Sequence, residues 1–456
     1  MKKIFMINSK AIKSVALLFV FVFTAFSCDN LLDAANPNSL VEDDLSNPAA
    51  AGPMVNGAQA SVTRALANIL LPAAIASDEV VWSGSRDAWQ QLNLGQLSDY
   101  ENEFTDAAFA YVSEARWWAD EVISRLEGFE TDGFAISDAL QTRAYIYGAI
   151  IYITIGDLYD DFAFSDKAVE GAPKGPANMV QVYDTAIGYL TKAIALGDSQ
   201  QLQALLARAH WGKAAWTKAR ARTGGTAALI DVAAANTAAA AALGGADFIL
   251  VVDSTTPDVV GDGSLAFGSE VNARKEQRLS DAYIVVDPAT GNSVNGITTG
   301  GVTSTDPAES ISLMDPIDGI PDPVLYDAVV DFVTSNLHPD FTITSEREMR
   351  LILAEAALSQ SNLTDFATHI NAVRALNSAD GLTPWVDAVT SGISAQDLLI
   401  HERRVNLYLQ GRRLVDHYRF NQPSVYWLPS SDAMNAVTFF PIGITEARAN
   451  TLVPLK

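Results

Sequence analysis

The sequence of 456 residues contains a single cysteine, Cys28, and five histidines. One cysteine cannot form an intrachain disulfide, and the histidines are scattered without the spacing of a zinc site. The chain also lacks the G-x-x-x-x-G-K-[ST] and G-x-G-x-x-G phosphate loops and the G-x-S-x-G elbow of serine hydrolases. These absences exclude several large enzyme classes, and we predict no catalytic residue and no required cofactor.

Positive charge is scarce: 30 Lys and Arg stand against 54 Asp and Glu, for a formal net charge of −24. Nucleic-acid binding needs clustered basic side chains, so this balance argues against nucleic acid as a partner and favours a neutral or cationic ligand. Hydrophobic residues make up 49% of the chain, which is typical of a globular protein with a large core.

The N-terminus has the pattern of a bacterial lipoprotein. Lysines precede an apolar run from Val15 to Phe26, and Ala25-Phe26-Ser27-Cys28 matches a lipobox. We therefore predict a signal peptide over residues 1–27, lipidation at Cys28, and a Pro- and Asn-rich tether over residues 28–48. A cleaved secretory signal with an incidental cysteine is the alternative.

Residues 49–243 are predicted to be helical, because small and apolar residues recur every three to four positions. One long helix is expected from Ala49 to Asp78, interrupted at Pro72. Further helices are expected over Ala107–Gly128, Ser137–Tyr159, Ala177–Leu196, Gln201–Arg222 and Leu229–Leu243. Val182–Leu196 and Ala207–Ala214 resemble helices of tetratricopeptide repeats, which stack in pairs into an array.

A segment from Asp78 to Leu92 mixes two tryptophans with acids, an arginine and amides, and is expected to form a loop. Aromatic rings can stack on the C–H face of a sugar while polar side chains bond its hydroxyl groups. The segment therefore gives these candidate ligand-binding residues: Asp78, Trp82, Arg86, Trp89 and Gln90. Packing in the core is the alternative role for either tryptophan.

Residues 244–343 lose helical periodicity and are rich in Gly, Asp, Thr, Ser and Pro. We predict a loop-rich insertion with short strands at Phe248–Val252 and Ala282–Val286, and Tyr283 joins the ligand-binding candidates. Asp258–Gly263 and Asp315–Gly319 offer oxygen ligands for calcium, although neither has the ligand density of an EF-hand loop.

Regular structure returns in residues 344–456. Ser345 with Glu348 predicts a helix start, as does Ser394 with Asp397. In the second helix Glu402 shares an apolar face, which is costly unless a cation pairs with it. The expected partners are nearby arginines: Arg403, Arg404, Arg412 and Arg413. A structural ion pair is the simpler interpretation, and a catalytic acid is the alternative.

The pattern E-R-R-x-x-L-x-x-x-G-x-R-x-x-D, from Glu402 to Asp416, resembles the C-terminal signature of the SusD/RagB family. It includes the structural motif residues Glu402, Arg403, Arg404, Arg413 and Asp416. Three further segments resemble family elements in the same order: Arg347–Leu358, Ile370–Arg374 and Phe439–Glu446. The chain departs from the family pattern at Gln410, Leu414-Val415 and Gly443.

The resemblance implies a mainly α fold: a tetratricopeptide-like scaffold with a loop-rich insertion, in which residues 344–456 pack with residues 49–243 as one domain. It implies a lipid-anchored protein of the outer membrane, facing the cell exterior. Such a protein would bind an oligosaccharide and deliver it to a SusC-like TonB-dependent transporter. A surface glycoside hydrolase, a peptide-binding RagB-like protein and a repeat adaptor that binds only proteins remain alternatives.

Overall fold

The computed structural model describes residues 44–166, 169–250, 270, 274, 276–285, 297–298, 301–302, 311–334, 340–378 and 381–455. The predicted signal peptide, Cys28 and most of the tether lie outside the described residues. The chain divides into two compact units, Met1–Ala50 and Ala51–Lys456. In the first unit the described residues form two short 3-10 helices, η1 (Asp44–Ser46) and η2 (Pro48–Ala50).

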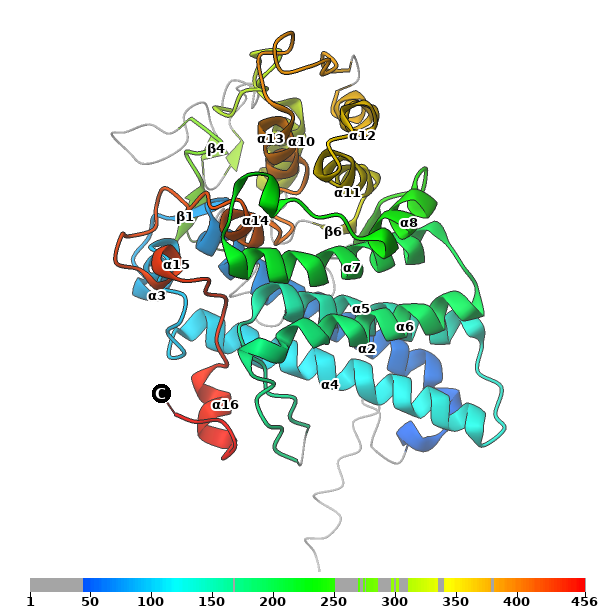
Figure 1. The fold of residues 1–456 in the computed structure, drawn as a ribbon. Helices are drawn as coiled ribbons and strands as arrows, with labels where there is room; N and C mark the ends of the chain where they lie inside the picture. The colour runs from blue at the N-terminus through cyan, green and yellow to red at the C-terminus, as the bar shows by residue number, and fades with distance from the viewer. Residues whose placement is uncertain are drawn as a thin grey trace, which may run out of the picture. The chain divides into compact units, whose positions relative to one another are not determined.

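The first part of the second unit is a stack of long helices, which lie side by side in Figure 1. They are α2 (Ala51–Ser77), α4 (Glu103–Thr131), α5 (Asp138–Leu158), α6 (Val182–Leu196), α7 (Gln200–Ala221) and α8 (Ala233–Ala242). Helix α4 packs on α2 and α5, α6 packs on α5, and α7 packs on α6 and α8. The predicted helical scaffold is therefore confirmed.

Helix α2 runs without a break through Pro72, where we expected an interruption. All residues from Ala65 to Ser77 are buried, so packing on every side holds the helix through the proline. In the described part of the chain, one helical run, Pro48–Ser77, is apolar and long enough to cross a membrane. However, 83% of its most apolar stretch is buried within the protein. That degree of burial is typical of a core helix.

The longer helices that follow the insertion are α11 (Glu346–Ser359), α12 (Leu363–Leu376), α13 (Ala395–Asn406) and α14 (Arg413–Arg419). Both predicted helix starts are confirmed, because Ser345 Oγ accepts from the N–H of Glu348 and Ser394 Oγ accepts from the N–H of Asp397, each at 3.1 Å. Helix α13 ends at Asn406, and Glu402 lies in its last two turns.

The C-terminal helices share a core with the N-terminal stack. Met349 and Ile352 of α11 pack among small residues of α7 and α8, including Ala207 and Ala239, and all four side chains are buried. Helix α14 packs against α7 and α2. The segments before and after the insertion therefore meet in one hydrophobic interior.

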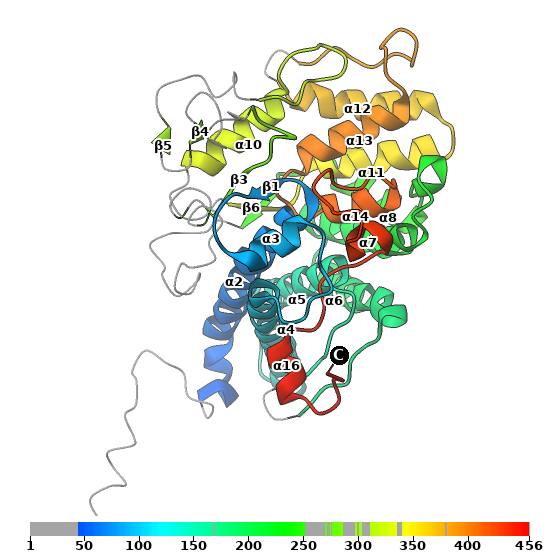
Figure 2. The same ribbon diagram turned by 90° about the vertical axis from the view of Figure 1, so that its left-hand side faces the viewer.

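The insertion contains short strands and a helix, and Figure 2 shows this helix beside α13. Three antiparallel pairs join β1 (Val80–Trp82) to β3 (Gln277–Leu279), β2 (Phe248–Leu250) to β6 (Phe341–Thr344), and β4 (Ile297–Thr298) to β5 (Gly301–Val302). The strand predicted at Phe248 is present, whereas Ala282 and Tyr283 lie in a turn. Helix α10 (Pro323–Thr334) was not predicted.

The remaining elements are short. They are α3 (Asp87–Asn93), η3 (Pro176–Gln181), η4 (Gly225–Ala228), α15 (Asp432–Asn435) and α16 (Ile444–Ala449). Helix α3 occupies part of the segment that we expected to be a loop, and it packs against α2, α4 and β1.

Candidate functional site

The segment from Trp82 to Gln90, which we call the Trp82 segment, links β1 to α3 and is fixed by one acid from the insertion. The Glu276 carboxylate accepts the N–H of Ser85 at 2.9 Å, the N–H of Arg86 at 3.1 Å and the Ser85 hydroxyl at 3.1 Å. Burial alone would raise the pKa of Glu276, but these backbone and hydroxyl donors lower it below its usual value. Glu276 therefore binds the start of α3 as a carboxylate.

Gly84 is required by this close approach. Its N–H donates to the Glu276 carbonyl at 3.0 Å, and a Cβ on Gly84 would lie 2.6 Å from Glu276 Cα. We expect Gly84→Ala to push the two segments apart and to lower the free energy of unfolding by about 1 to 3 kcal/mol. Urea denaturation of the two proteins measures the difference, with Gly128→Ala on α4 as a control for a glycine whose added Cβ meets nothing within 4 Å. Equal losses in both variants would contradict the close approach.

Three predicted ligand-binding residues keep partly exposed side chains: Trp82, Arg86 and Gln90. Trp82 pairs with Gln277 across the β1–β3 ladder, and its backbone N–H donates to Asn93 Oδ1 at 3.3 Å. The Arg86 guanidinium lies 3.6 Å from Glu270 and 5.3 Å from the centre of the Phe104 ring. The Trp82 segment therefore carries an indole, a guanidinium and an amide on residues that are all partly exposed.

Several buried polar atoms of this segment and of the residues that contact it lack hydrogen-bond partners. Among the residues that the structure describes, the Trp82 indole N–H, the Asn93 amide nitrogen and both amide atoms of Gln277 have no hydrogen-bond partner. Each such buried group costs about 1 to 3 kcal/mol, and native proteins keep few of them unless a bound molecule or a function accounts for them. No sequence pattern identified Asn93 or Gln277 as a candidate site residue. Gln277 lies opposite Trp82 only because strands β1 and β3, which are far apart in the sequence, pair with each other.

The other three candidates are buried, and our expectation that they face a ligand was wrong. Trp89 is 0% exposed and stacks on Phe104 at 3.5 Å, because α3 turns this side chain toward α4. Asp78 and Tyr283 are brought together in the interior, where the Tyr283 hydroxyl donates to Asp78 at 3.2 Å. Arg413 binds Asp78 through two N–H groups at 2.9 and 3.0 Å.

Although burial favours the neutral acid, Arg413 and His417 hold the pKa of Asp78 well below its usual range. Asp78 follows α2 directly and Arg413 opens α14. This pair therefore joins the N-terminal helices to the C-terminal motif, and it has a structural role.

Glu402 pairs with Arg374 of α12, and not with the four nearby arginines that we expected. Arg374 Nη1 lies 2.8 Å from Glu402 Oε1, and the amides of Asn377 and Asn406 each donate to Oε2 at 3.0 Å. The Glu402 residue is 1% exposed, and burial raises its pKa to about 7. Such an enclosed group favours the structural ion pair over the catalytic acid.

The expected arginines bind other partners. Arg403 and Arg419 both hold Asp416, at 2.8 and 2.6 Å, and these arginines bring its pKa to about 2 against the opposing effect of burial. Arg412 binds Glu348 at 3.1 Å, and Arg404 donates to the Ala282 carbonyl at 3.0 Å while its guanidinium lies over the Tyr283 ring. The signature thus forms a network of buried ion pairs between helices.

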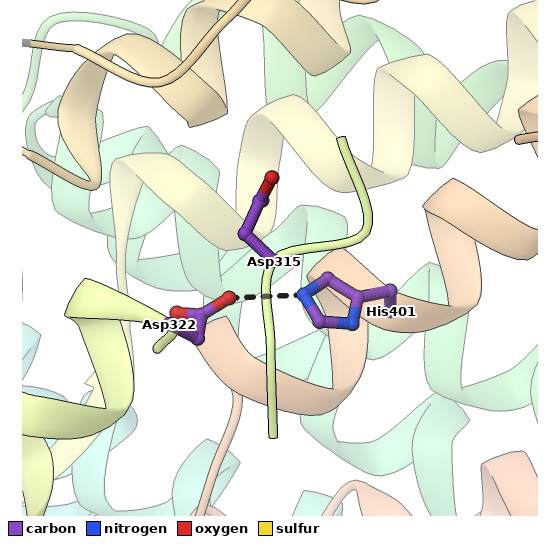
Figure 3. Close-up of side chains that lie close together, drawn as sticks. All are labelled: Asp315, Asp322 and His401. Carbon is purple, nitrogen blue, oxygen red and sulfur yellow. Dashed lines mark hydrogen bonds and ion pairs between the residues drawn. The ribbon is translucent and has the colours of Figure 1, made fainter. Parts of the chain in front are cut away.

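Figure 3 shows the one group of acidic and histidine side chains close enough to hold a metal ion within the described part of the chain: Asp315, Asp322 and His401. His401 Nε2 lies 2.9 Å from Asp322. Asp315, a calcium candidate from the sequence, accepts from Arg374 at 2.7 and 3.0 Å and from the N–H groups of Ile317 and Asp318. A guanidinium in that position repels a cation, so the geometry favours a structural carboxylate. Asp258–Gly263 lies outside the described residues.

A separate depression of about 380 Å³ lies beside the C-terminal residues, where Tyr100, Phe439 and Pro441 form part of its wall. Two charged groups on its wall already bind each other, because Arg220 forms an ion pair with Asp160, and the Arg220 guanidinium stacks 4.2 Å from the centre of the Trp216 ring. This depression therefore gives a weaker indication of a ligand than the Trp82 segment.

No protein-family model matches this chain, and no curated protein matches it either. Solved structures do match it. A SusD superfamily protein from Bacteroides vulgatus ATCC 8482 is 12% identical with a TM-score of 0.58, over 90% of this chain and 98% of that chain. One from Bacteroides thetaiotaomicron VPI-5482 is 14% identical with a TM-score of 0.58, over 89% of this chain and 99% of that chain.

A third structure, B. fragilis NanU, is 14% identical with a TM-score of 0.55, over 92% of this chain and 98% of that chain. The likeness therefore includes the helical stack and the C-terminal helices alike. By this likeness, and by the mainly helical architecture described above, the chain has the fold of the SusD superfamily.

Proposed function

We propose that this protein is a lipid-anchored member of the SusD/RagB family that binds an oligomeric nutrient at the cell surface and does not transform it. The fold supports this proposal, as does the lipobox ending at Cys28, whose acyl chains would anchor the protein firmly in the outer membrane. Delivery to a SusC-like TonB-dependent transporter is part of the same proposal and follows from the family resemblance.

The observation that carries the binding site is the composition of the Trp82 segment. Trp82, Arg86 and Gln90 are all partly exposed in one short segment, and in the described residues polar atoms of Trp82, Asn93 and Gln277 lack hydrogen-bond partners. An oligosaccharide offers both an apolar C–H face for the ring and hydroxyl groups that donate and accept. It therefore fits this surface better than an apolar ligand does, and a peptide is the alternative.

Trp82→Ala tests the assignment, with Trp82→Phe as the matched control that keeps an aromatic face. The protein would carry Cys28→Ser so that it stays in solution, and binding to plant and host oligosaccharides would be measured by isothermal titration. We expect a Kd near 1 μM, or about −8 kcal/mol, because capture must be reversible. Trp82→Ala is expected to weaken binding at least about tenfold, and Trp82→Phe much less.

Three outcomes would redirect the assignment. Unchanged affinity in Trp82→Ala, with unchanged circular dichroism, would remove the Trp82 segment as the ligand site. Affinity for peptides alone would support a RagB-like peptide-binding protein. Affinity for neither class would favour the repeat adaptor.

A further inference from the structure

The start of β1 is tied to α14 and to the linker before it, residues 407–412. Asp78 accepts two N–H groups of Arg413, at 2.9 and 3.0 Å. The next residue, Glu79, accepts the N–H of Leu409 through its carboxyl group at 2.8 Å and the Tyr408 hydroxyl through its carbonyl at 3.0 Å. Asp78 and Glu79 are both buried. Two adjacent acids are therefore enclosed where β1 begins.

A continuous run of hydrogen bonds connects Glu79 to the Trp82 segment. The Glu79 carbonyl also accepts the N–H of Ser280 at 3.3 Å, directly before the paired residues of β1 and β3. Beyond β1, the Glu276 carbonyl accepts the next two backbone N–H groups, each at 3.0 Å, and the Glu276 carboxylate accepts the two after them. A backbone that is held at every step moves as a unit, so a shift at Glu79 is passed to the Trp82 segment.

The linker on the other side of Glu79 is strained. Leu409 has a φ of 59°, in the left-handed region that a leucine rarely adopts. Such a residue costs about 1 to 3 kcal/mol and persists only where its surroundings hold it. A rearrangement of the linker releases this strain. Separating the linker from β1 therefore costs less than the contacts between them alone would require.

The charges around Glu79 make its carboxyl group hard to ionise. Although burial opposes ionisation, Arg413 and His417 hold the pKa of Asp78 well below its usual range, so Asp78 is charged. His417 is neutral near pH 7, since burial and Arg413 lower its pKa. The charge of Arg413 is thus paired with that of Asp78. An ionised Glu79 would add a second, unpaired negative charge in the interior.

Two tyrosines and an arginine from neighbouring elements complete the cluster around Glu79. Burial is the main cause that raises the pKa of Tyr283 and of Tyr408 above the ordinary value of 10. The Arg404 guanidinium lies 4.4 Å from the centre of the Tyr283 ring. Burial likewise raises the pKa of Glu79 to about 8. Among the acids of this cluster in the described residues, Glu79 is therefore the one whose charge changes between pH 7 and pH 9.

We propose that Glu79 positions the Trp82 segment only while it is protonated, so that ligand affinity falls when Glu79 ionises. This inference rests on the proposed function of that segment. Ionisation places a second charge beside Asp78, and water reaches that charge when β1 and the linker separate. The Trp82 segment then moves with β1. Ligand binds the protonated arrangement that the structure shows, and binding at high pH therefore takes up a proton.

The size of the effect follows from the fraction of molecules that hold the proton. With a pKa of about 8, roughly nine molecules in ten are protonated at pH 7 and about one in eleven at pH 9. The apparent Kd is the intrinsic Kd divided by the competent fraction, so we expect it to rise about tenfold from pH 7 to pH 9. Binding at pH 9 should take up close to one proton per ligand.

Isothermal titration of the mature chain carrying Cys28→Ser measures both quantities. The probe is the oligosaccharide that binds most tightly in the Trp82→Ala experiment, and two buffers that differ in ionisation enthalpy report the proton uptake. Glu79→Gln resembles the protonated acid, so we expect one Kd at both pH values and no proton uptake. Glu101→Gln, at a side chain that is 62% exposed, should keep the tenfold change of the wild type.

Two results of these titrations would overturn the inference. One is an equal Kd at pH 7 and pH 9 in the wild type, and the other is a tenfold change that persists in Glu79→Gln. Either result would leave oligosaccharide binding at the Trp82 segment intact.

Hydrogen exchange tests the same coupling without a ligand. After correction for the intrinsic pH dependence of exchange, peptides covering residues 80–92 should exchange faster at pH 9 than at pH 7 in the wild type. Glu79→Gln should remove this difference, and equal protection at both pH values in the wild type would overturn the inference. If no oligosaccharide binds at any pH, the proposed function fails, and the exchange measurement alone decides whether Glu79 controls the segment.

Discussion

Arg374→Met is expected to lower the free energy of unfolding by about 3 to 5 kcal/mol, because it leaves buried carboxylates without their cation. The Arg374 side chain is 0% exposed and lies 2.7 Å from Asp315 and 2.8 Å from Glu402. Its Nε also donates to the Thr383 carbonyl at 2.8 Å. Methionine fills a similar volume, so the loss measured in urea reports mainly the missing charge and hydrogen bonds.

Arg350→Met is the matched control, since it removes an arginine from the neighbouring helix α11. Arg350 pairs with Glu346 one turn away, and both side chains are partly exposed, at 23% and 22%. Such a pair contributes about 0.5 kcal/mol or less. A loss in Arg374→Met as small as the loss in Arg350→Met would contradict the role we assign to Arg374. Adding Glu402→Gln to Arg374→Met should recover part of the stability, because one uncompensated carboxylate is gone.

Glu79→Gln is expected to remove a fall in stability that the wild type shows as the pH rises. Glu79 is 1% exposed, and its carboxylate accepts the N–H of Leu409 at 2.8 Å. Burial is the main cause that raises the pKa of Glu79 from its ordinary 4.5 to about 8, and the charge of Asp78 adds to it. The folded protein therefore holds this proton over a range in which the unfolded chain has released it.

Stability falls with rising pH because the folded and unfolded states bind different numbers of protons at Glu79. Between pH 4.5 and pH 8 the folded state binds more protons at Glu79, so the free energy of unfolding contributed by this group is fully present below pH 4.5 and falls as the pH rises. The fall amounts to roughly 3 to 4 kcal/mol between pH 5 and pH 9, at about 1.4 kcal/mol for each pKa unit.

Urea denaturation of the wild type and Glu79→Gln at four pH values from 5 to 9 measures the effect. Glutamine keeps an acceptor for Leu409 but has no proton to lose, so the variant should be the more stable protein at high pH. Glu101→Gln, at a side chain that is 62% exposed, is the control and should follow the wild type. Parallel pH profiles for the wild type and Glu79→Gln would contradict the assignment.

Local patterns predicted most of the helices. The Ser345 and Ser394 caps need residues only three positions apart, and both were confirmed. Glu402 was correctly expected to be buried and paired, since an acid on an apolar face needs a cation. Its partner could not be predicted, because Arg374 lies on another helix and is brought near only by the packing of α12 against α13.

The candidate ligand site was only partly predictable for a similar reason. Composition singled out the residues from Asp78 to Gln90, but it could not separate Trp82, on a strand edge, from Trp89, which α3 turns inward to Phe104. The sequence predicted that Asp78 contacts a ligand, but in the structure Asp78 pairs with Arg413 of α14. Tertiary contacts decide which polar side chains remain available to contact a ligand.

We propose that this protein binds a nutrient without converting it. The most direct measurement is an equilibrium titration of the mature protein with the best-binding oligosaccharide, followed by mass spectrometry of the ligand recovered after prolonged incubation. We predict saturable binding of one ligand per chain and recovery of that ligand with its mass unchanged. Shortened products that form in proportion to the amount of protein would contradict the claim and would support a surface glycoside hydrolase.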